Sequence, residues 1–275
     1  MITEATFVTG NHMTYELLLG TYPDGCPMVK HDAGLHEASV CSIMLRTARV
    51  DALLAVLFWV DTLRERYGPQ AIVFNLPFIP GARQDRLNPE GDRLFTLLSV
   101  ARAINTRNFS KVRVFDPHSD VAPGLIERCE AWGPFNLLTT QKITYDAVIA
   151  PDGGAEKRAM GVAKHLNVPL YHAWKSRNVA TGQISGFGCE PIPESVQKAL
   201  VVDDICDGGG TFIGLRGAVP EHVSLDLYVT HGLFTAGTEK LRKMFGRLIC
   251  TDSVCDGGEG ITLIPVCNLL RRTTT

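Results

Sequence analysis

The chain has 275 residues, of which 45% are hydrophobic and 20% are charged, and its formal net charge is −2 at pH 7. It is long enough for one large or two modest cores, and its nearly balanced charge gives no reason to expect nucleic acid or an anionic membrane surface as a partner. The N-terminal residues lack the charged-then-apolar pattern of a signal peptide, and the longest apolar run, 52–60, is too short to span a bilayer. We therefore expect a cytoplasmic protein with no nucleic-acid or membrane partner.

In chain order we expect a helix at 41–66, a strand at 71–78, a helix at 93–107, strands at 111–115 and 145–150, a helix at 155–165, a strand at 198–202, a helix at 210–216 and a strand at 223–230. The strands are continuous apolar runs, each followed by a loop rich in Gly, Asp or His, which is typical of buried parallel strands with helices between them. The predicted class is α/β, with ligands at the carboxyl ends of the strands. Two similar halves account for the length, and the predicted domains are 1–139 and 140–275.

The eight cysteines are scattered, with no Cys-x-x-Cys pair. Zinc sites and thioredoxin-like redox chemistry both need closer spacing. We expect most of these cysteines to be buried thiols in a reducing compartment.

The segment VVDDICDGGGT (201–211) places three carboxylates beside three glycines. Consecutive glycines let backbone N–H groups converge on an anion, and a helix beginning at the end of the loop adds its positive dipole end. A phosphate therefore suits the second half of the segment, Asp207, Gly208, Gly209, Gly210 and Thr211. Asp203 and Asp204 would repel a phosphate, so they would face another part of the ligand, such as ribose hydroxyls. The alternative is a flexible glycine turn with solvated aspartates.

This segment resembles the phosphoribosyl-diphosphate loop of two families, the type I phosphoribosyltransferases and the ribose-phosphate diphosphokinases. Both families share two hydrophobic residues followed by Asp-Asp at the start of the loop and Gly-Gly-Thr at its end. Position 208 is usually Thr and is Gly208 here, so one hydroxyl donor is missing but the backbone cradle remains. The loop alone does not separate the two families.

The segment NLPFIPGARQDR (75–86) resembles a diphosphokinase motif that phosphoribosyltransferases lack. Guanidinium groups and an amide suit polyphosphate oxygens and a purine edge, although RQDR alone also reads as a solvated charged loop. The resemblance implies four ATP contacts, Arg83, Gln84, Asp85 and Arg86.

Two further strand ends resemble the same family. FDPHSD (115–120) implies that His118 contacts ATP and binds Mg²⁺, and the alternative is a histidine held in the loop by Asp116 or Asp120. PDGGAEKRA (151–159) implies that Asp152 binds Mg²⁺ and that Gly154 lets the phosphates approach; Ala155 replaces a common second glycine.

YHAWKSRN (171–178) ends a predicted strand and precedes VATGQISGFG, which has the features of a mobile flap. Two cations suit the charge of a transferring diphosphoryl group, although an isolated Lys-x-Arg is usually a solvated surface pair. The resemblance implies that Lys175 and Arg177 are catalytic and close over ATP.

TYPDGCPMV (21–29) resembles the segment with which a neighbouring subunit grips the adenine. The resemblance implies that Tyr22 and Asp24 bind ATP and that the protein is a homo-oligomer, a dimer or larger. Cys26 stands where the family has a glutamate.

Segments from about residue 22 to residue 253 resemble the ribose-phosphate diphosphokinases in the family's order. The resemblance implies two type I phosphoribosyltransferase-like domains, each a mainly parallel sheet flanked by helices. It also implies transfer of the diphosphoryl group of ATP to ribose 5-phosphate with Mg²⁺. Two alternatives are a type I phosphoribosyltransferase and a catalytically silent, synthetase-like regulatory subunit, which would be expected to lack the ATP motifs or the metal ligands and flap cations.

Overall fold

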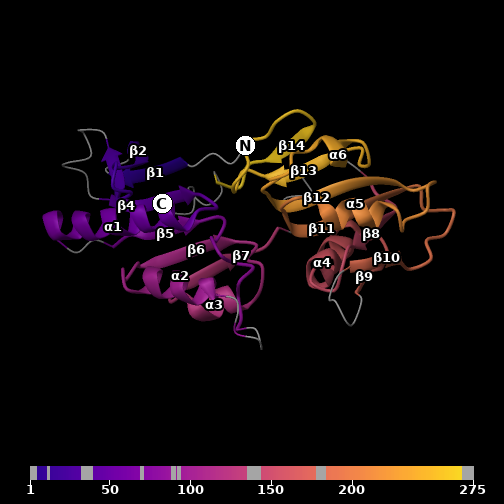
Figure 1. Ribbon diagram of the computed structural model, residues 1–275, viewed down its shortest axis with the longest axis horizontal. Helices are drawn as coiled ribbons and strands as arrows, with labels where there is room; N and C mark the ends of the chain where they lie inside the picture. Colours follow the sequence, from indigo (N-terminus) through magenta and orange to yellow (C-terminus); the bar gives the residue numbers. More distant parts are fainter. Residues whose placement is uncertain are drawn as a thin grey trace. The chain divides into compact units, whose positions relative to one another are not determined.

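The computed structural model describes residues 5–10, 13–31, 40–68, 71–87, 91, 94–134, 144–177 and 184–267. The chain forms two compact units (Figure 1). The first unit contains Ile2–Gly133 and Pro265–Thr275, and the second contains Pro134–Ile264. The predicted domain boundary at 139/140 lies outside the described residues.

In the first unit, the described strands form one sheet in the order β3-β2-β1-β4-β5-β6-β7. Pairing is antiparallel from β3 to β4 and parallel from β4 to β7. The strands are β1 (Ala5–Gly10), β2 (Met13–Thr21), β3 (Pro27–His31), β4 (Val40–Arg46), β5 (Val73–Leu76), β6 (Lys111–Phe115) and β7 (Cys129–Trp132). The helices α1 (Val50–Tyr67), α2 (Thr96–Asn105) and α3 (Val121–Leu125) share one apolar core with the sheet.

In the second unit, the described strands form a sheet in the order β10-β9-β8-β11-β12-β13-β14, and only the β9–β10 pair is antiparallel. The strands are β8 (Ala147–Ala150), β9 (Leu170–Arg177), β10 (Ile184–Cys189), β11 (Lys198–Cys206), β12 (Ser224–Gly232), β13 (Leu248–Thr251) and β14 (Ile261–Ile264). The helices are α4 (Glu156–Leu166), α5 (Gly210–Arg216) and α6 (Glu239–Arg242). The α5 and α6 helices share the main core cluster, while α4 packs on β8, β9 and β11.

The structure confirms the α/β class and its two units, and it corrects one expected helix. The helix predicted at 41–66 begins only at Val50, because 40–46 form strand β4 in the middle of the sheet. Residues 42–45 are all buried, so both faces of β4 are covered and its sequence shows no alternation.

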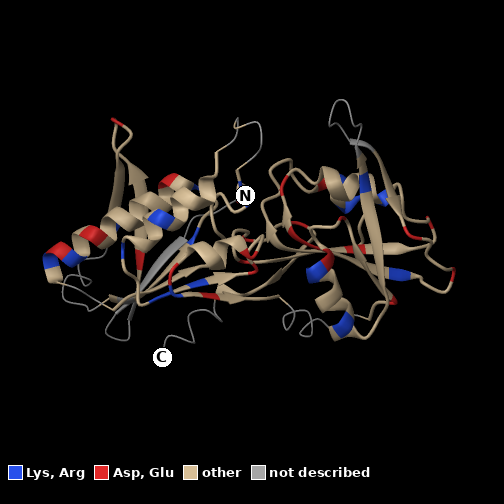
Figure 2. Cartoon of the chain, turned by 90° about the horizontal axis from the view of Figure 1, so that it is seen from below, with Lys and Arg blue, Asp and Glu red and all other residues tan. Residues whose placement is uncertain are grey.

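Lys and Arg residues are interspersed with Asp and Glu along both units (Figure 2). Of the described cysteines, Cys206, Cys250, Cys255 and Cys267 are buried, and all seven are free thiols. Among the described helices, none is both long and apolar enough to cross a bilayer.

Candidate functional site

The acidic and glycine-rich segment spans the end of β11, a tight turn and the start of α5. β11 runs on through Asp203 and Asp204 to Cys206, so both aspartates lie within the strand rather than beyond it. Gly209 has a φ of +78°, a conformation that residues with a Cβ rarely adopt. A Cβ at Gly209 would also lie 3.2 Å from the Leu241 side chain. The turn that the sequence predicts as a phosphate cradle therefore needs a glycine at this position.

Two cations reach the carboxylates at the ends of β8 and β11. The Lys175 Nζ atom lies 2.7 Å from Oδ2 of Asp152, and the Gly154 N–H donates to Oδ1 of the same carboxylate at 3.0 Å. From α4, Arg158 Nη1 lies 3.9 Å from Oδ1 of Asp204, and both side chains are buried. β8, β9 and β11 are neighbours in the sheet, which brings these groups to one edge.

Among the carboxylates at these strand ends, Asp203 has a strongly raised pKa. Burial, together with the neighbouring carboxylates of Asp204 and Asp152, raises the pKa of Asp203 to about 8. A buried carboxylate beside like charges gains stability from a further cation. Among the described residues, no three His, Cys, Asp or Glu side chains form a ready metal cluster. Mg²⁺ takes only one or two protein carboxylates and completes its shell with phosphate oxygens and water, so this donor set fits Mg²⁺.

The structure places the Lys-x-Arg pair within strand β9 rather than on a flap. Lys175 pairs with Phe187 and Arg177 with Ile184 of β10, so the second half of the predicted flap is a strand. The glycines of VATGQISGFG indicate flexibility from sequence, but the Trp174 ring fills the place that a Cβ at Gly188 would take. That glycine therefore allows close packing. Residues 178–183 and the Arg177 side chain lie outside the description.

In the first unit, the GARQDR loop follows β5, and its side chains divide into two groups. Arg83, Gln84 and Arg86 are exposed, whereas the Asp85 side chain is only 3% exposed and accepts a hydrogen bond from Arg86 Nε at 3.0 Å. Burial raises the pKa of Asp85, but hydrogen bonds with Arg86 and Ser119 and the charges of Arg86 and His118 outweigh it, so its pKa is lowered. Asp85 thus links this loop to the loop that carries His118.

Tyr22 and Asp24 lie in the turn between β2 and β3, at the edge of the first sheet. Both residues are exposed. The Tyr22 N–H donates to the Cys26 carbonyl at 2.8 Å, and the Cys26 N–H donates to Asp24 Oδ1 at 3.0 Å. These two hydrogen bonds fix the turn that presents the two side chains to solvent.

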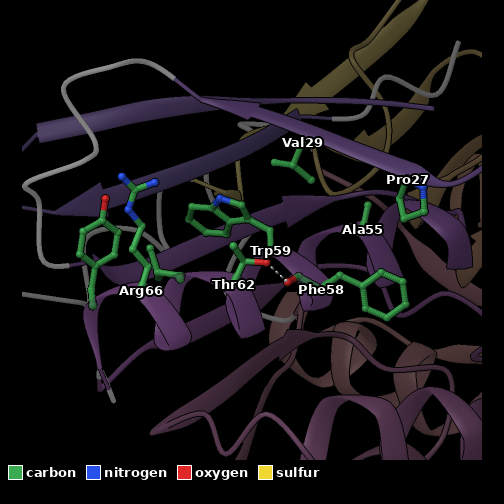
Figure 3. Close-up of a pocket in the computed structure, with 9 residues that line it drawn as sticks. Pro27, Val29, Ala55, Phe58, Trp59, Thr62 and Arg66 are labelled. Atoms are coloured by element: carbon green, nitrogen blue, oxygen red, sulfur yellow. Dashed lines mark hydrogen bonds between the residues drawn. The ribbon is translucent and has the colours of Figure 1, made fainter. Parts of the chain in front are cut away.

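A cavity of about 260 Å³ lies between this hairpin and α1 (Figure 3). Pro27 and Val29 of β3 line one side, and Phe58, Trp59 and Thr62 of α1 line the other. The Thr62 hydroxyl donates to the Phe58 carbonyl within the helix. None of the residues predicted from sequence to act in the site lines this cavity.

Sequence reasoning missed two residues of the second unit that touch predicted site residues. Arg158 pairs with Asp204, although it stands inside the quoted motif PDGGAEKRA. Thr235, in the loop that follows β12, donates its hydroxyl to Asp207 Oδ1 at 2.5 Å. The sequence did not identify these two residues as partners of Asp204 and Asp207, because the contacting residues are 46 and 28 positions apart in the chain.

Comparisons with known proteins agree on one family. No family model matches the chain. The ribose-phosphate pyrophosphokinase of Thermococcus kodakarensis is 25% identical over 259 residues, which cover 91% of this chain and 90% of the relative. That of Mycoplasma pneumoniae is 29% identical over 242 residues, covering 82% and 70%. The crystal structure of phosphoribosylpyrophosphate synthetase from Mycobacterium smegmatis shares the fold, with a TM-score of 0.76 at 22% identity over 94% of this chain and 88% of that one.

Two α/β units with acidic and glycine-rich strand ends define a protein of the type I phosphoribosyltransferase-like fold class. Within that class, the relatives match over most of both chains. Over most of its length, the chain is similar to the ribose-phosphate pyrophosphokinases.

Proposed function

We propose that this chain transfers the diphosphoryl group of ATP to the anomeric hydroxyl of ribose 5-phosphate, giving 5-phosphoribosyl 1-diphosphate and AMP. One observation of the structure carries the proposal. Asp152 lies just after β8, the neighbour of β11, and pairs with Lys175 of β9 on the other side of β8, while the end of β11 holds Asp203, Asp204 and the glycine turn. The names of the relatives support the same reaction.

The ribose 5-phosphate binds, in this proposal, along the end of β11 and the turn that follows. Asp207, Gly208, Gly209, Gly210 and Thr211 cradle the 5-phosphate, and a Cβ built at Gly210 would meet nothing within 4 Å, which leaves room beside the turn. The carboxylates of Asp203 and Asp204 accept hydrogen bonds from the ribose hydroxyls. The phosphate end of the ligand is thereby held by the glycine turn, and the ribose end by carboxylates that accept hydrogen bonds.

The anomeric hydroxyl attacks the β-phosphorus in line, and AMP leaves. Such a transfer needs positioning and charge neutralisation more than covalent chemistry. Lys175 and Arg177 supply positive charge to the transferring group, so Lys175 must exchange its partner Asp152 for phosphate oxygens. No general base is required.

Mg²⁺, when bound, would neutralise charge on the phosphate oxygens. The sequence predicts His118 and Asp152 as its ligands, and these two residues belong to different units. The raised pKa of Asp203 supports a cation near Asp152, and Asp203 is a further candidate ligand in the same unit.

ATP contacts are assigned to the exposed side chains of Arg83, Gln84 and Arg86, with His118 beside them, and Asp85 is the buried member of that group. Tyr22 and Asp24 serve the adenine of a neighbouring subunit. A cytoplasmic location and the lack of a nucleic-acid or membrane partner stay predictions.

A homo-oligomer, a dimer or larger, is part of the proposal. The hairpin β2–β3 and helix α1 expose large apolar side chains, with Leu18 59%, Tyr22 54% and Phe58 48% exposed, which a contact between subunits would remove from water.

The products distinguish the proposal from its alternatives. With ATP, Mg²⁺ and ribose 5-phosphate, we expect AMP and 5-phosphoribosyl 1-diphosphate in equal amounts, with no AMP when ribose 5-phosphate is omitted. Formation of ADP would indicate transfer of a single phosphoryl group. A type I phosphoribosyltransferase or a silent subunit would form no AMP, and that result would refute the proposal.

A further inference from the structure

The loop after β12 is bonded to the start of the predicted ribose-5-phosphate loop. The N–H groups of Leu233 and Phe234 both donate to the Cys206 carbonyl, at 2.9 and 3.0 Å. The Thr235 N–H donates to the Asp207 carbonyl at 3.2 Å. Three consecutive residues of one loop thus hold the two residues that lead from β11 into the glycine turn.

Thr235 adds a side-chain bond to the same partner. Its hydroxyl donates to Asp207 Oδ1 at 2.5 Å, the short distance expected of an O–H donor and an ionised carboxylate. Backbone and side chain of Thr235 therefore bind backbone and side chain of Asp207. Two bonds between one pair of residues fix both the path of the chain at Asp207 and the direction of its carboxylate.

The loop after β12 is anchored where it leaves the strand. Phe234 has a φ of +45°, which is unfavourable for a bulky residue, yet its ring is buried in the core cluster over Gly232. In β12 just before the loop, His231 Nδ1 lies 2.8 Å from the Ser253 hydroxyl, and the Thr251 hydroxyl donates to the Thr230 carbonyl at 2.6 Å. Such a fully buried, hydrogen-bonded network resists deformation. The backbone that leads to Thr235 is therefore held rigidly in place.

We propose that Thr235 is a positioning residue for the ribose-5-phosphate loop. Its hydroxyl holds the Asp207 carboxylate aside and fixes the entry to the glycine turn, so that residues 208–211 present their N–H groups to the phosphate. The inference rests on the proposed function for the role of the loop, but the Thr235–Asp207 contact stands apart from it. Thr235 itself touches no substrate in this scheme.

Two substitutions at this site separate the hydroxyl from the shape of the side chain. Thr235→Val keeps the branched shape and removes the hydroxyl, whereas Thr235→Ser keeps the hydroxyl. A matched control is Thr238→Val, three residues further on, because the Thr238 side chain makes no capping hydrogen bond to α6. We expect Thr235→Val to raise the KM for ribose 5-phosphate roughly three- to tenfold, judged from the strength of hydrogen bonds to charged groups. The KM for ATP and the melting temperature should stay unchanged, and Thr235→Ser and Thr238→Val should resemble the wild type.

A second measurement needs no substrate. Hydrogen exchange of peptides covering 205–212, followed by mass spectrometry on the ligand-free protein, should be faster in Thr235→Val and unchanged in Thr235→Ser and Thr238→Val. Unchanged exchange in Thr235→Val, or an equal effect of Ser and Val, would overturn the positioning role. If the wild type forms no AMP, the proposed function fails, while the exchange experiment still decides whether Thr235 orders the loop. A rise in both KM values with a lower melting temperature would reduce Thr235 to a general structural residue.

Discussion

Asp203 and Asp204 are neighbours on β11 but meet different charges. Asp204 pairs with Arg158 of α4, whereas the charges acting on Asp203 are the carboxylates of Asp204 and Asp152. The sequence motif does not distinguish the two aspartates. In the structure, Asp204 is paired with a cation, whereas Asp203 is buried beside other carboxylates.

This difference predicts a pH-dependent stability that Asp203 dominates. The pKa of Asp203 is raised from 3.8 to about 8, so between these values the folded chain holds a proton that the unfolded chain has lost. The free energy of unfolding of the metal-free protein should therefore fall as the pH rises from 4 to 8, by at most about 1.4 kcal/mol per pH unit from this group. Asp203→Asn should remove that slope and stabilise the protein at pH 8. Urea unfolding in EDTA at several pH values measures both effects.

Asp204→Asn is the matched control for this experiment. It removes one carboxylate partner of the buried Arg158 guanidinium and should destabilise the protein at every pH from 5 to 8. Parallel pH curves for the wild type and Asp203→Asn would contradict the assignment of the raised pKa to Asp203. Asp203 holds a proton in the folded chain below about pH 8, whereas Asp204 pairs with a guanidinium, so the two substitutions should change the free energy of unfolding in opposite directions.

At the scale of elements, the sequence predicts the parallel strands β5, β6, β8, β11 and β12 and misses β4, β7, β13 and β14 as well as the antiparallel hairpins. The run 111–115 matches β6, and 210–216 matches α5, because a continuous apolar run and a glycine-flanked helix each have a local signal. β4 was assigned to a helix, since a short, fully buried strand has no period that distinguishes it from a buried helix. The hairpins β1–β2 and β9–β10 pair strands that follow one another in the chain, and the sequence analysis did not predict these pairings.

A polar cluster around the buried Asp226 connects three strands of the second unit near their amino ends. The Tyr145 hydroxyl, just before β8, donates to Asp226 Oδ2 of β12 at 3.0 Å, and Lys198 Nζ of β11 lies 3.2 Å from the same oxygen. Burial and the charge of Asp226 raise the pKa of Tyr145, so its hydroxyl stays a donor at neutral pH. The cluster lies away from the site and serves stability.

Tyr145→Phe should therefore lower the free energy of unfolding by about 1.5 to 3 kcal/mol, the range for a hydrogen bond to a charged group. The ring remains under Lys198, whose ammonium lies 5.3 Å from its centroid, so the loss reports on the hydroxyl alone. Denaturant unfolding measures it, and turnover per folded molecule should not change. Tyr171→Phe on β9 is the control and should have little effect. A loss below 0.5 kcal/mol in Tyr145→Phe would show that Lys198 alone satisfies Asp226.

At the scale of the whole molecule, the predicted site residues are divided between the two units. Arg83, Gln84, Arg86 and His118 belong to the first unit, and Asp152, Lys175 and the β11 turn belong to the second. The two sheets share a run of four sequential parallel strands, β4 to β7 and β11 to β14. Each unit thus brings its loops to strand ends in the same way, and the hairpin that carries Tyr22 is an addition at the edge of the first sheet.

The exposed position of Tyr22 leads to a prediction about assembly. If the adenine is gripped by a neighbouring subunit, one active site combines Tyr22 of one chain with Lys175 of another. Tyr22→Ala and Lys175→Ala should each be nearly inactive, Lys175→Ala by roughly 10²-fold, the loss typical of a residue that stabilises transition-state charge. Chains of the two variants, carrying different tags and assembled together, should recover roughly a quarter of the wild-type activity in a symmetric dimer, because half the dimers are mixed and each has one intact site.

The control for this recovery is a pair of variants that damage the same half-site. Asp152→Asn and Lys175→Ala remove two groups that lie 2.7 Å apart in one unit, so their mixture should recover nothing. Recovery in the first mixture and none in the second would establish a shared adenine site. If neither mixture recovers activity although the tags prove mixed assembly, Tyr22 acts within its own chain or not at all, because subunits that exchange freely must otherwise form intact sites.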